Sequence, residues 1–162
     1  SKPNLDTRRF TTELKNAGWL DLNNHSGSLA VGNQKLGFLG VDDPHENLDN
    51  LESLPSQAAE ISGTELVIGV AHAPYLRVIE AFGNSGADMI FAGHTHGGQI
   101  CLPGKRALVT NCDLPTKYAQ GLSAWKGEEN DTLLHVSGGI GCSIYAPVRL
   151  FCPPSATLLT VS

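Results

Sequence analysis

The strongest constraint on the fold is a pair of short apolar segments separated by a helix-sized stretch. Residues 66–71 (Leu-Val-Ile-Gly-Val-Ala) are continuously apolar, which is typical of a strand buried on both faces of a sheet. Pro74 suits the first turn of a helix, and residues 89–92 (Met-Ile-Phe-Ala) form a second buried strand pattern. Strand, helix and strand within about thirty residues indicate a βαβ unit with parallel strands.

The segments on either side of this unit have shorter and more varied patterns. We predict an amphipathic helix, a hairpin turning at Gly32-Asn33, a second short helix and then, after the βαβ unit, a β-rich region without helices. The chain 1–162 is therefore predicted to be a single α/β domain. The predicted ranges are 4–17 (helix), 28–31 and 35–41 (hairpin strands), 46–54 (short helix), and 107–110, 132–137 and 156–161 (strands).

Composition excludes several classes of protein. The 162 residues carry 11 basic and 16 acidic side chains, so the formal charge is 11 − 16 = −5, and no broad basic surface for nucleic acid is predicted. No apolar run approaches the ~20 residues of a membrane-spanning helix. The four cysteines include no Cys-x-x-Cys pair and are interpreted as reduced structural residues, although an even number also permits two disulfides.

Three histidines follow the two predicted parallel strands. His72 comes after the first strand, and His94 and His96 come after the second within a glycine-rich string. Ligands of open α/β sheets bind beyond the carboxyl ends of the strands, and neutral imidazole is a common ligand of transition metals. In an extended segment, residues two apart project to the same side, about 6.6 Å apart. The pattern predicts a metal site, with ordinary core or surface histidines as the alternative.

The string Gly-His-Thr-His-Gly-Gly-Gln at residues 93–99, preceded by His72, resembles the last two metal-binding motifs of the calcineurin-like metallophosphoesterases. Residues 136–143 and 147–150 resemble the closing segment of one bacterial branch of phosphohydrolases, so the resemblance extends from about Val41 onward. It implies a β-sandwich flanked by helices, of which this chain would be the C-terminal half.

The resemblance also implies a chemistry. Members of this family hold two divalent metal ions, commonly Mn, Fe or Zn, and use metal-activated water to hydrolyse phosphate mono- or diesters. Carried over residue by residue, His72 and His94 would bind one ion and His96 the other. The expected partner of the site is a phosphoester substrate.

The other motifs of the family are missing. Gly-Asp-x-x-Asp and Gly-Asn-His do not occur, and Asp43-Pro44-His45 is interpreted as a chance match to the family's Asp-x-His. The catalytic histidine of the family would therefore lie upstream, and no catalytic residue is predicted here. We expect the chain to be inactive alone and to need the N-terminal half of the same domain. Loss of that half would bare an edge near His72 and favour self-association. The alternative function is a non-catalytic metal-binding or interaction module.

The remaining candidate residues have less specific interpretations. Gly138–Gly141 has turn chemistry without the Lys-Ser/Thr of a phosphate-binding P-loop, and no Gly-x-Ser-x-Gly elbow indicates a serine hydrolase. His135 is predicted to be a satisfied sheet histidine, and His25 and His45 are predicted loop residues. Arg149 is assigned to a surface salt bridge, with a phosphate contact as the alternative. Lys105 and Arg106 are assigned to a solvated turn.

Overall fold

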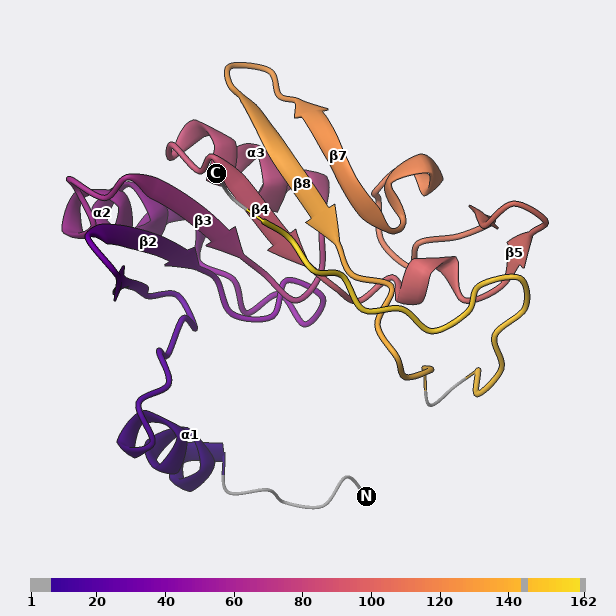
Figure 1. Ribbon diagram of the computed structural model, residues 1–162, viewed down its shortest axis with the longest axis horizontal. Coiled ribbons are helices and arrows are strands. Elements are labelled where there is room, and N and C mark those ends of the chain that lie inside the picture. The colour runs from indigo at the N-terminus through magenta and orange to yellow at the C-terminus, as the bar shows by residue number, and fades with distance from the viewer. Residues whose placement is uncertain (1–6, 144–145, 161–162) are drawn as a thin grey trace.

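The computed structural model describes residues 7–143 and 146–160 of the chain (Figure 1). Its elements follow the order helix, hairpin, helix, βαβ unit and β-rich region. The α-helices are α1 (Thr7–Asn16), α2 (Leu54–Glu60) and α3 (Leu76–Asn84), with 3-10 turns η1 (Leu51–Ser53), η2 (His96–Gly98) and η3 (Thr116–Tyr118). The strands are β1 (Ser26–Val31), β2 (Gln34–Gly40), β3 (Leu66–Val70), β4 (Met89–Ala92), β5 (Cys101–Leu102), β6 (Arg106–Ala107), β7 (Gly121–Lys126) and β8 (Asp131–Val136).

Six of the strands form one mixed sheet in the order β1-β2-β3-β4-β8-β7. The central strands β2, β3, β4 and β8 run parallel to one another, and β1 and β7 are antiparallel strands at the two edges. The predicted βαβ unit and the hairpin at Gly32-Asn33 are confirmed. Strands β5 and β6 form a separate two-stranded ribbon.

Helices α2 and α3 cover one face of the large sheet, as Figure 1 shows behind β2, β3 and β4. The core on this face joins apolar side chains of both helices to those of the parallel strands. Packing against α3 is close at Gly69 in β3, where an added Cβ would lie 2.8 Å from the fully buried ring of Phe82. A side chain at residue 69 would push α3 away from the sheet. The fold is therefore α/β, with a central sheet flanked by helices.

The expectation of a bared edge near His72 is wrong. The strand that precedes His72 is β3, which has β2 on one side and β4 on the other. Both neighbours are supplied by this chain because the hairpin strand β2 returns to pair in parallel with β3. The exposed edges are those of β1 and β7.

Several predicted boundaries differ from the structure. The helix predicted at residues 46–54 is a turn followed by η1, and the helix proper, α2, begins one residue before Pro55, which suits a first helical turn. Strand β6 ends at Ala107, so residues 108–110 are not a strand, and described residues 156–160 form no strand. Strands β5 and β7 were not predicted. The region was predicted to contain no helix; its described residues contain the 3-10 turns η2 and η3 but no α-helix.

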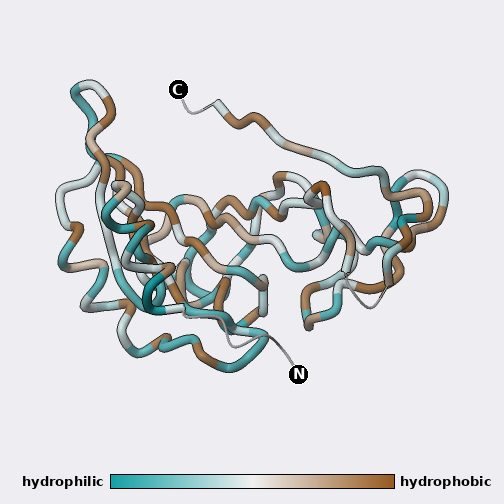
Figure 2. The backbone as a smooth tube through the Cα atoms, turned by 90° about the horizontal axis from the view of Figure 1, so that it is seen from below, coloured by the Kyte–Doolittle hydropathy of each residue, from teal (hydrophilic) through white to brown (hydrophobic). Residues whose placement is uncertain are grey.

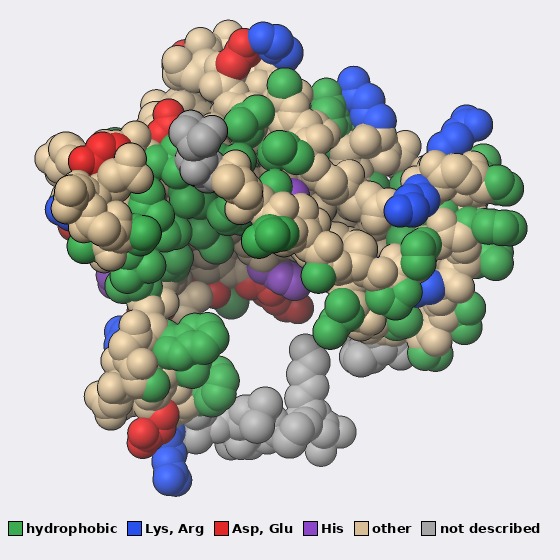
Figure 3. Space-filling model, in the orientation of Figure 1, with side chains coloured by type: hydrophobic (Ala, Val, Ile, Leu, Met, Phe, Trp, Pro, Cys, Tyr) green, Lys and Arg blue, Asp and Glu red, His purple; other side chains and the backbone are tan. Residues whose placement is uncertain are grey.

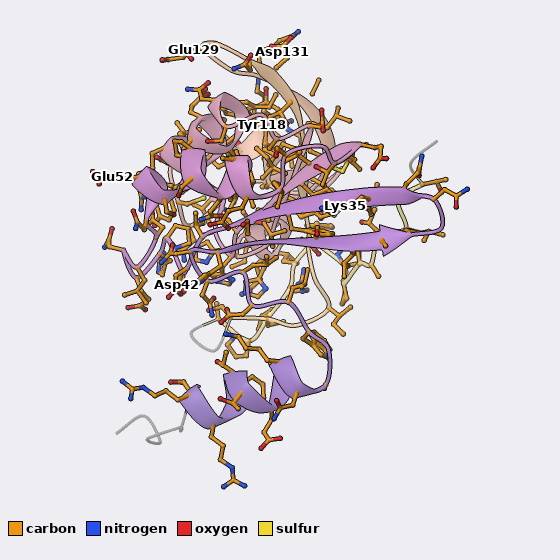
Figure 4. The ribbon with its side chains drawn as sticks, turned by 90° about the vertical axis from the view of Figure 1, so that its left-hand side faces the viewer. Lys35, Asp42, Glu52, Tyr118, Glu129 and Asp131 are labelled. Atoms are coloured by element: carbon orange, nitrogen blue, oxygen red, sulfur yellow. The ribbon has the colours of Figure 1, made fainter. Side chains whose placement is uncertain are left out.

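The two ends of the described chain lie away from the sheet. Helix α1 has no buried residue and stands apart from the rest of the molecule (Figures 1 and 4). The C-terminal segment crosses in front of the sheet in Figure 1, and Figure 2 shows that it stands off from it. Consistent with this, Leu158 is 94% exposed. None of the helices in the described ranges is long and apolar enough to cross a membrane.

Candidate metal site

A cleft of about 600 Å³ opens beyond the carboxyl ends of β3 and β4. This is the position at which parallel α/β sheets bind ligands. All three predicted ligands line this cleft, together with acidic and apolar side chains from other segments. The lining residues are Asp43, His45, Glu46, His72, His94, Thr95, His96, Gly98, Gln99, Ile100, Val109, Thr110, Asn111, Cys142, Ser143 and Ala146.

His72 and His94 are in direct contact. Nε2 of His72 lies 3.2 Å from Nδ1 of His94, and the two rings meet edge to face with centroids 5.1 Å apart. Two nitrogen ligands of one tetrahedral ion, each about 2.0–2.1 Å from it, lie about 3.3 Å apart. The spacing of these two nitrogens therefore suits a shared cation.

The surroundings of His94 favour a neutral ring with Nδ1 free to bind. The backbone carbonyl of Asn111 lies 3.1 Å from Nε2, closer than the side-chain amide nitrogen of Asn111 at 3.3 Å. A carbonyl can only accept, so Nε2 carries the proton and Nδ1 presents its lone pair. Burial lowers the pKa of His94, and the neighbouring His45 and His72 lower it further. Ligation requires this neutral form.

His96 lines the same cleft but is held mainly through its backbone. Its carbonyl accepts hydrogen bonds from Nη1 of Arg149 at 3.0 Å and from the thiol of Cys152 at 3.3 Å. Burial lowers the pKa of the imidazole, and the charge of Arg149 lowers it further. The structure thus brings His72 and His94 together and places His96 on the wall of the same cleft.

The loop that carries His94 and His96 is not extended, so the extended conformation from which their spacing was predicted is wrong. Both residues have positive φ angles, +65° and +50°, and Gln99 has +54°. Such angles are uncommon outside glycine and often mark functional sites. Thr95 stabilises the turn, because its buried hydroxyl donates to the carbonyl of Ala119 at 2.7 Å and accepts from the amide of Gly97 at 3.2 Å.

Arg149 does not form the surface salt bridge that its sequence context suggested. Its guanidinium donates to backbone carbonyls of two other segments of the chain, at His96 and at the turn that begins with Gly138. The further acceptors are the carbonyls of Gly139, Gly141 and Cys152. The carbonyls of the Gly138–Gly141 turn are thereby gathered around one cation. Arg149 connects the closing segment of the chain to the loop that carries His94 and His96, which we call the histidine loop.

Sequence reasoning missed His45 as a site residue. His45 lies in a loop, as predicted, but its ring packs against that of His94 with centroids 4.5 Å apart, and its Nδ1 lies 3.0 Å from the hydroxyl of Tyr75. Arg77 of α3 anchors this loop by pairing with Asp49 and donating to the carbonyl of Pro44. The Asp-Pro-His string after the β2 strand was the available signal, and its position at the cleft was not foreseen.

His135 also differs from its prediction. It lies in β8 as expected and is buried, with its ring edge-on to that of Phe91 at 5.8 Å. However, Nε2 of His135 has no hydrogen-bond partner, so the residue is not satisfied. Burial lowers its pKa, which keeps the ring neutral. His25 is a loop residue, as predicted, with Nδ1 2.6 Å from the carbonyl of Asn23.

The cysteines are all free thiols. Cys101 and Cys152 are buried, and both thiols contact the carbonyl of Gly97 at 3.3 Å. Cys112 is half-buried and Cys142 is exposed.

The donor set fits a metal ion only in part. Over the described ranges, no three His, Cys, Asp or Glu side chains form a group that could hold a metal ion. The His72–His94 pair has the spacing and the tautomer for one cation, whereas a complete two-metal ligand set is not assembled from these residues. The dinuclear site implied by the family resemblance therefore stays a prediction.

Comparison with known proteins finds a relative for most of the chain. The chain is 32% identical over 149 residues to the phosphodiesterase YaeI of Escherichia coli (strain K12), which covers 90% of the chain and 48% of that protein. The chain is thus similar over nearly its whole length to part of a phosphodiesterase. This agrees with the resemblance carried by residues 93–99 and with the expectation of a C-terminal part. No protein-family model matches the chain.

Two other similarities were found for this chain. It is 33% identical over 87 residues to the uncharacterized protein YpbG of Bacillus subtilis (strain 168), covering 54% of the chain and 32% of YpbG. The Haemophilus influenzae NAD nucleotidase (NadN) structure matches with a TM-score of 0.46 and 18% identity, covering 69% of this chain and 24% of NadN. The chain thus spans about half the length of YaeI, or less of the others.

Proposed function

We propose that the cleft is part of the active site of a metal-dependent phosphoester hydrolase that acts on phosphate mono- or diesters. The observation that carries the proposal is the 3.2 Å approach of His72 Nε2 to His94 Nδ1 beyond the ends of two parallel strands. The similarity to YaeI, a phosphodiesterase, supports the same reaction class.

In this proposal His72 and His94 hold one divalent cation and His96 contributes to a second. A bound cation would supply an activated water and would neutralise charge on the phosphate. The protein's own part is to favour the neutral form of His94 by burial and to fix its tautomer through the Asn111 carbonyl. Mn, Fe and Zn are all compatible with imidazole ligands.

The chain alone is proposed to be inactive, because the ligands found in it are imidazoles and the family's bridging aspartate and catalytic histidine are missing. The experiment has two parts. Binding of Co²⁺ or Zn²⁺ to the chain is measured by titration, with His94→Ala expected to weaken binding by at least about tenfold. The control is His25→Ala, because the His25 ring bonds to Asn23 outside the cleft. Equal binding by the two variants would contradict the assignment of His94.

The second part measures hydrolysis of bis(p-nitrophenyl) phosphate. We expect no significant turnover from the 162-residue chain and metal-dependent turnover from a longer protein that includes the missing motifs in the same reading frame. Hydrolysis by the chain at rates similar to those of the longer protein would refute the proposed inactivity.

The competing hypothesis is a non-catalytic metal-binding or interaction module. It is favoured by the incomplete ligand set of the described residues. If a longer protein with the missing motifs binds metal but hydrolyses neither mono- nor diesters, this second hypothesis replaces the first.

A further inference from the structure

Charge is distributed very unevenly along the chain. The net charge is −5, yet residues 89–112 and 132–162 contain no Asp or Glu and carry Lys105, Arg106 and Arg149. Arg149 is engaged with backbone carbonyls, so the outward-facing cations are Lys105 and Arg106 at the turn of the β5–β6 ribbon. In Figure 3 the part of the surface over this ribbon shows blue side chains among green ones and no red.

The same ribbon exposes apolar side chains on one face. Cys101 of β5 is buried, so its neighbours Ile100 and Leu102 project to the opposite side, and each is 44% exposed. The β5–β6 register places Leu102 opposite Arg106, and a parallel bridge places Ile100 beside Leu150, which is half exposed. We call this surface the basic apolar face; its members are Ile100, Leu102, Lys105, Arg106, Leu108 and Leu150.

The basic apolar face continues into the cleft. Ile100 belongs to both the face and the cleft lining, and Val109, which is 61% exposed, lines the cleft directly after Leu108. A surface docked against this face would therefore lie beside the opening that contains His72, His94 and His96.

We propose that the basic apolar face docks on an anionic lipid surface. Such a surface has anionic headgroups on the outside and acyl chains beneath them. The two cations at the tip of the ribbon would contact the headgroups, and the exposed aliphatic side chains beside them would contact the acyl chains. The lack of Asp and Glu in residues 89–112 and 132–162 supports an anionic lipid as the partner, because a carboxylate there would be repelled by the headgroups. This inference does not rest on the proposed hydrolase function.

The test is co-sedimentation of the chain with vesicles of equal parts phosphatidylglycerol and phosphatidylcholine, compared with phosphatidylcholine alone. We expect binding to the anionic vesicles that weakens with added salt. Each Lys or Arg near an anionic surface contributes about a fivefold gain in affinity. The double variant Lys105→Gln and Arg106→Gln should therefore bind about 25-fold more weakly. The double variant Leu102→Ser and Leu108→Ser should also lose binding, with unchanged circular dichroism.

A matched control lies at the other end of the sheet. Leu29 and Val31 of β1 are 43% and 56% exposed, and Lys35 of β2 is exposed close by. The variant Leu29→Ser, Val31→Ser and Lys35→Gln should bind as well as the parent chain. Equal loss in this control, equal binding to neutral vesicles, or no binding at all would overturn the proposal. Self-association through residues 102 and 108 that lipid does not displace would also overturn it and would assign the face to a second copy.

Discussion

Removal of the Thr95 hydroxyl tests how the histidine loop is held. In Thr95→Val the carbonyl of Ala119 and the amide of Gly97 lose their buried partner. At about 1.5 kcal/mol for each unpaired group the cost is about 3 kcal/mol, and the added buried methyl returns about 0.8 kcal/mol. We expect a net loss of about 2 kcal/mol in the free energy of unfolding, measured by urea denaturation with the fluorescence of the buried Trp125 as reporter.

The matched control is Thr132→Val, because Thr132 is also buried but makes a single bond, to the carbonyl of Ala87. It should lose about 0.7 kcal/mol and keep its affinity for Co²⁺. Thr95→Val should instead bind Co²⁺ more weakly, since the turn between His94 and His96 loosens. Stability of Thr95→Val within about 0.5 kcal/mol of the parent, with unchanged Co²⁺ affinity, would refute the reasoning.

Three more measurements follow from the same packing. Burial lowers the pKa of His135 below its ordinary 6.5. The unfolded chain therefore binds more protons than the folded one, and the free energy of unfolding should fall as the pH drops through 6.5. His135→Phe should flatten this pH dependence in urea unfolding between about pH 7.5 and about pH 5.5. Gly98→Ala places a Cβ 2.4 Å from that of Ala107 at a φ of +85° and should lower the free energy of unfolding by about 2–4 kcal/mol. Gly104→Ala is the control, because Gly104 has the same φ and open space around it, and it should lower that free energy by about 1 kcal/mol. Arg149→Met leaves the carbonyls of the buried Gly138 and Cys152 without this donor and should cost about 2–4 kcal/mol in urea unfolding, with Lys35→Met as the neutral control.

The parallel core of the fold was predictable because its signals are local. A continuous apolar run such as residues 66–70 can be satisfied only between two other strands, and the structure places β3 there. The partner on one side, β2, was predicted as a hairpin strand, but its parallel pairing with β3 was not. Pairing between distant segments depends on how the whole sheet closes, which composition and periodicity do not encode. This is why an exposed edge was expected where the structure has a covered strand.

The site was predictable in its residues but not in its geometry. Glycines around His94 and His96 indicated tight turns, and the positive φ angles of both histidines show how the turns are made. The contact of His45 with His94 depends on Arg77 holding a loop from another part of the chain. The bonding pattern of Arg149 likewise depends on carbonyls that are distant in sequence. Neither arrangement has a local pattern from which it could be inferred.

The conformation of the histidine loop therefore depends on the C-terminal segment as much as on β4. Three residues that are not glycine hold positive φ angles in it, His94, His96 and Gln99, at a cost of about 1–3 kcal/mol each. That cost must be offset by contacts from outside the loop. Arg149 and Cys152 supply them at the His96 carbonyl, and the amide of Leu150 bonds to the carbonyl of Gln99 at 3.0 Å. Removing residues 147–160 should therefore release the loop and weaken Co²⁺ binding, even though His72, His94 and His96 would all remain in the chain.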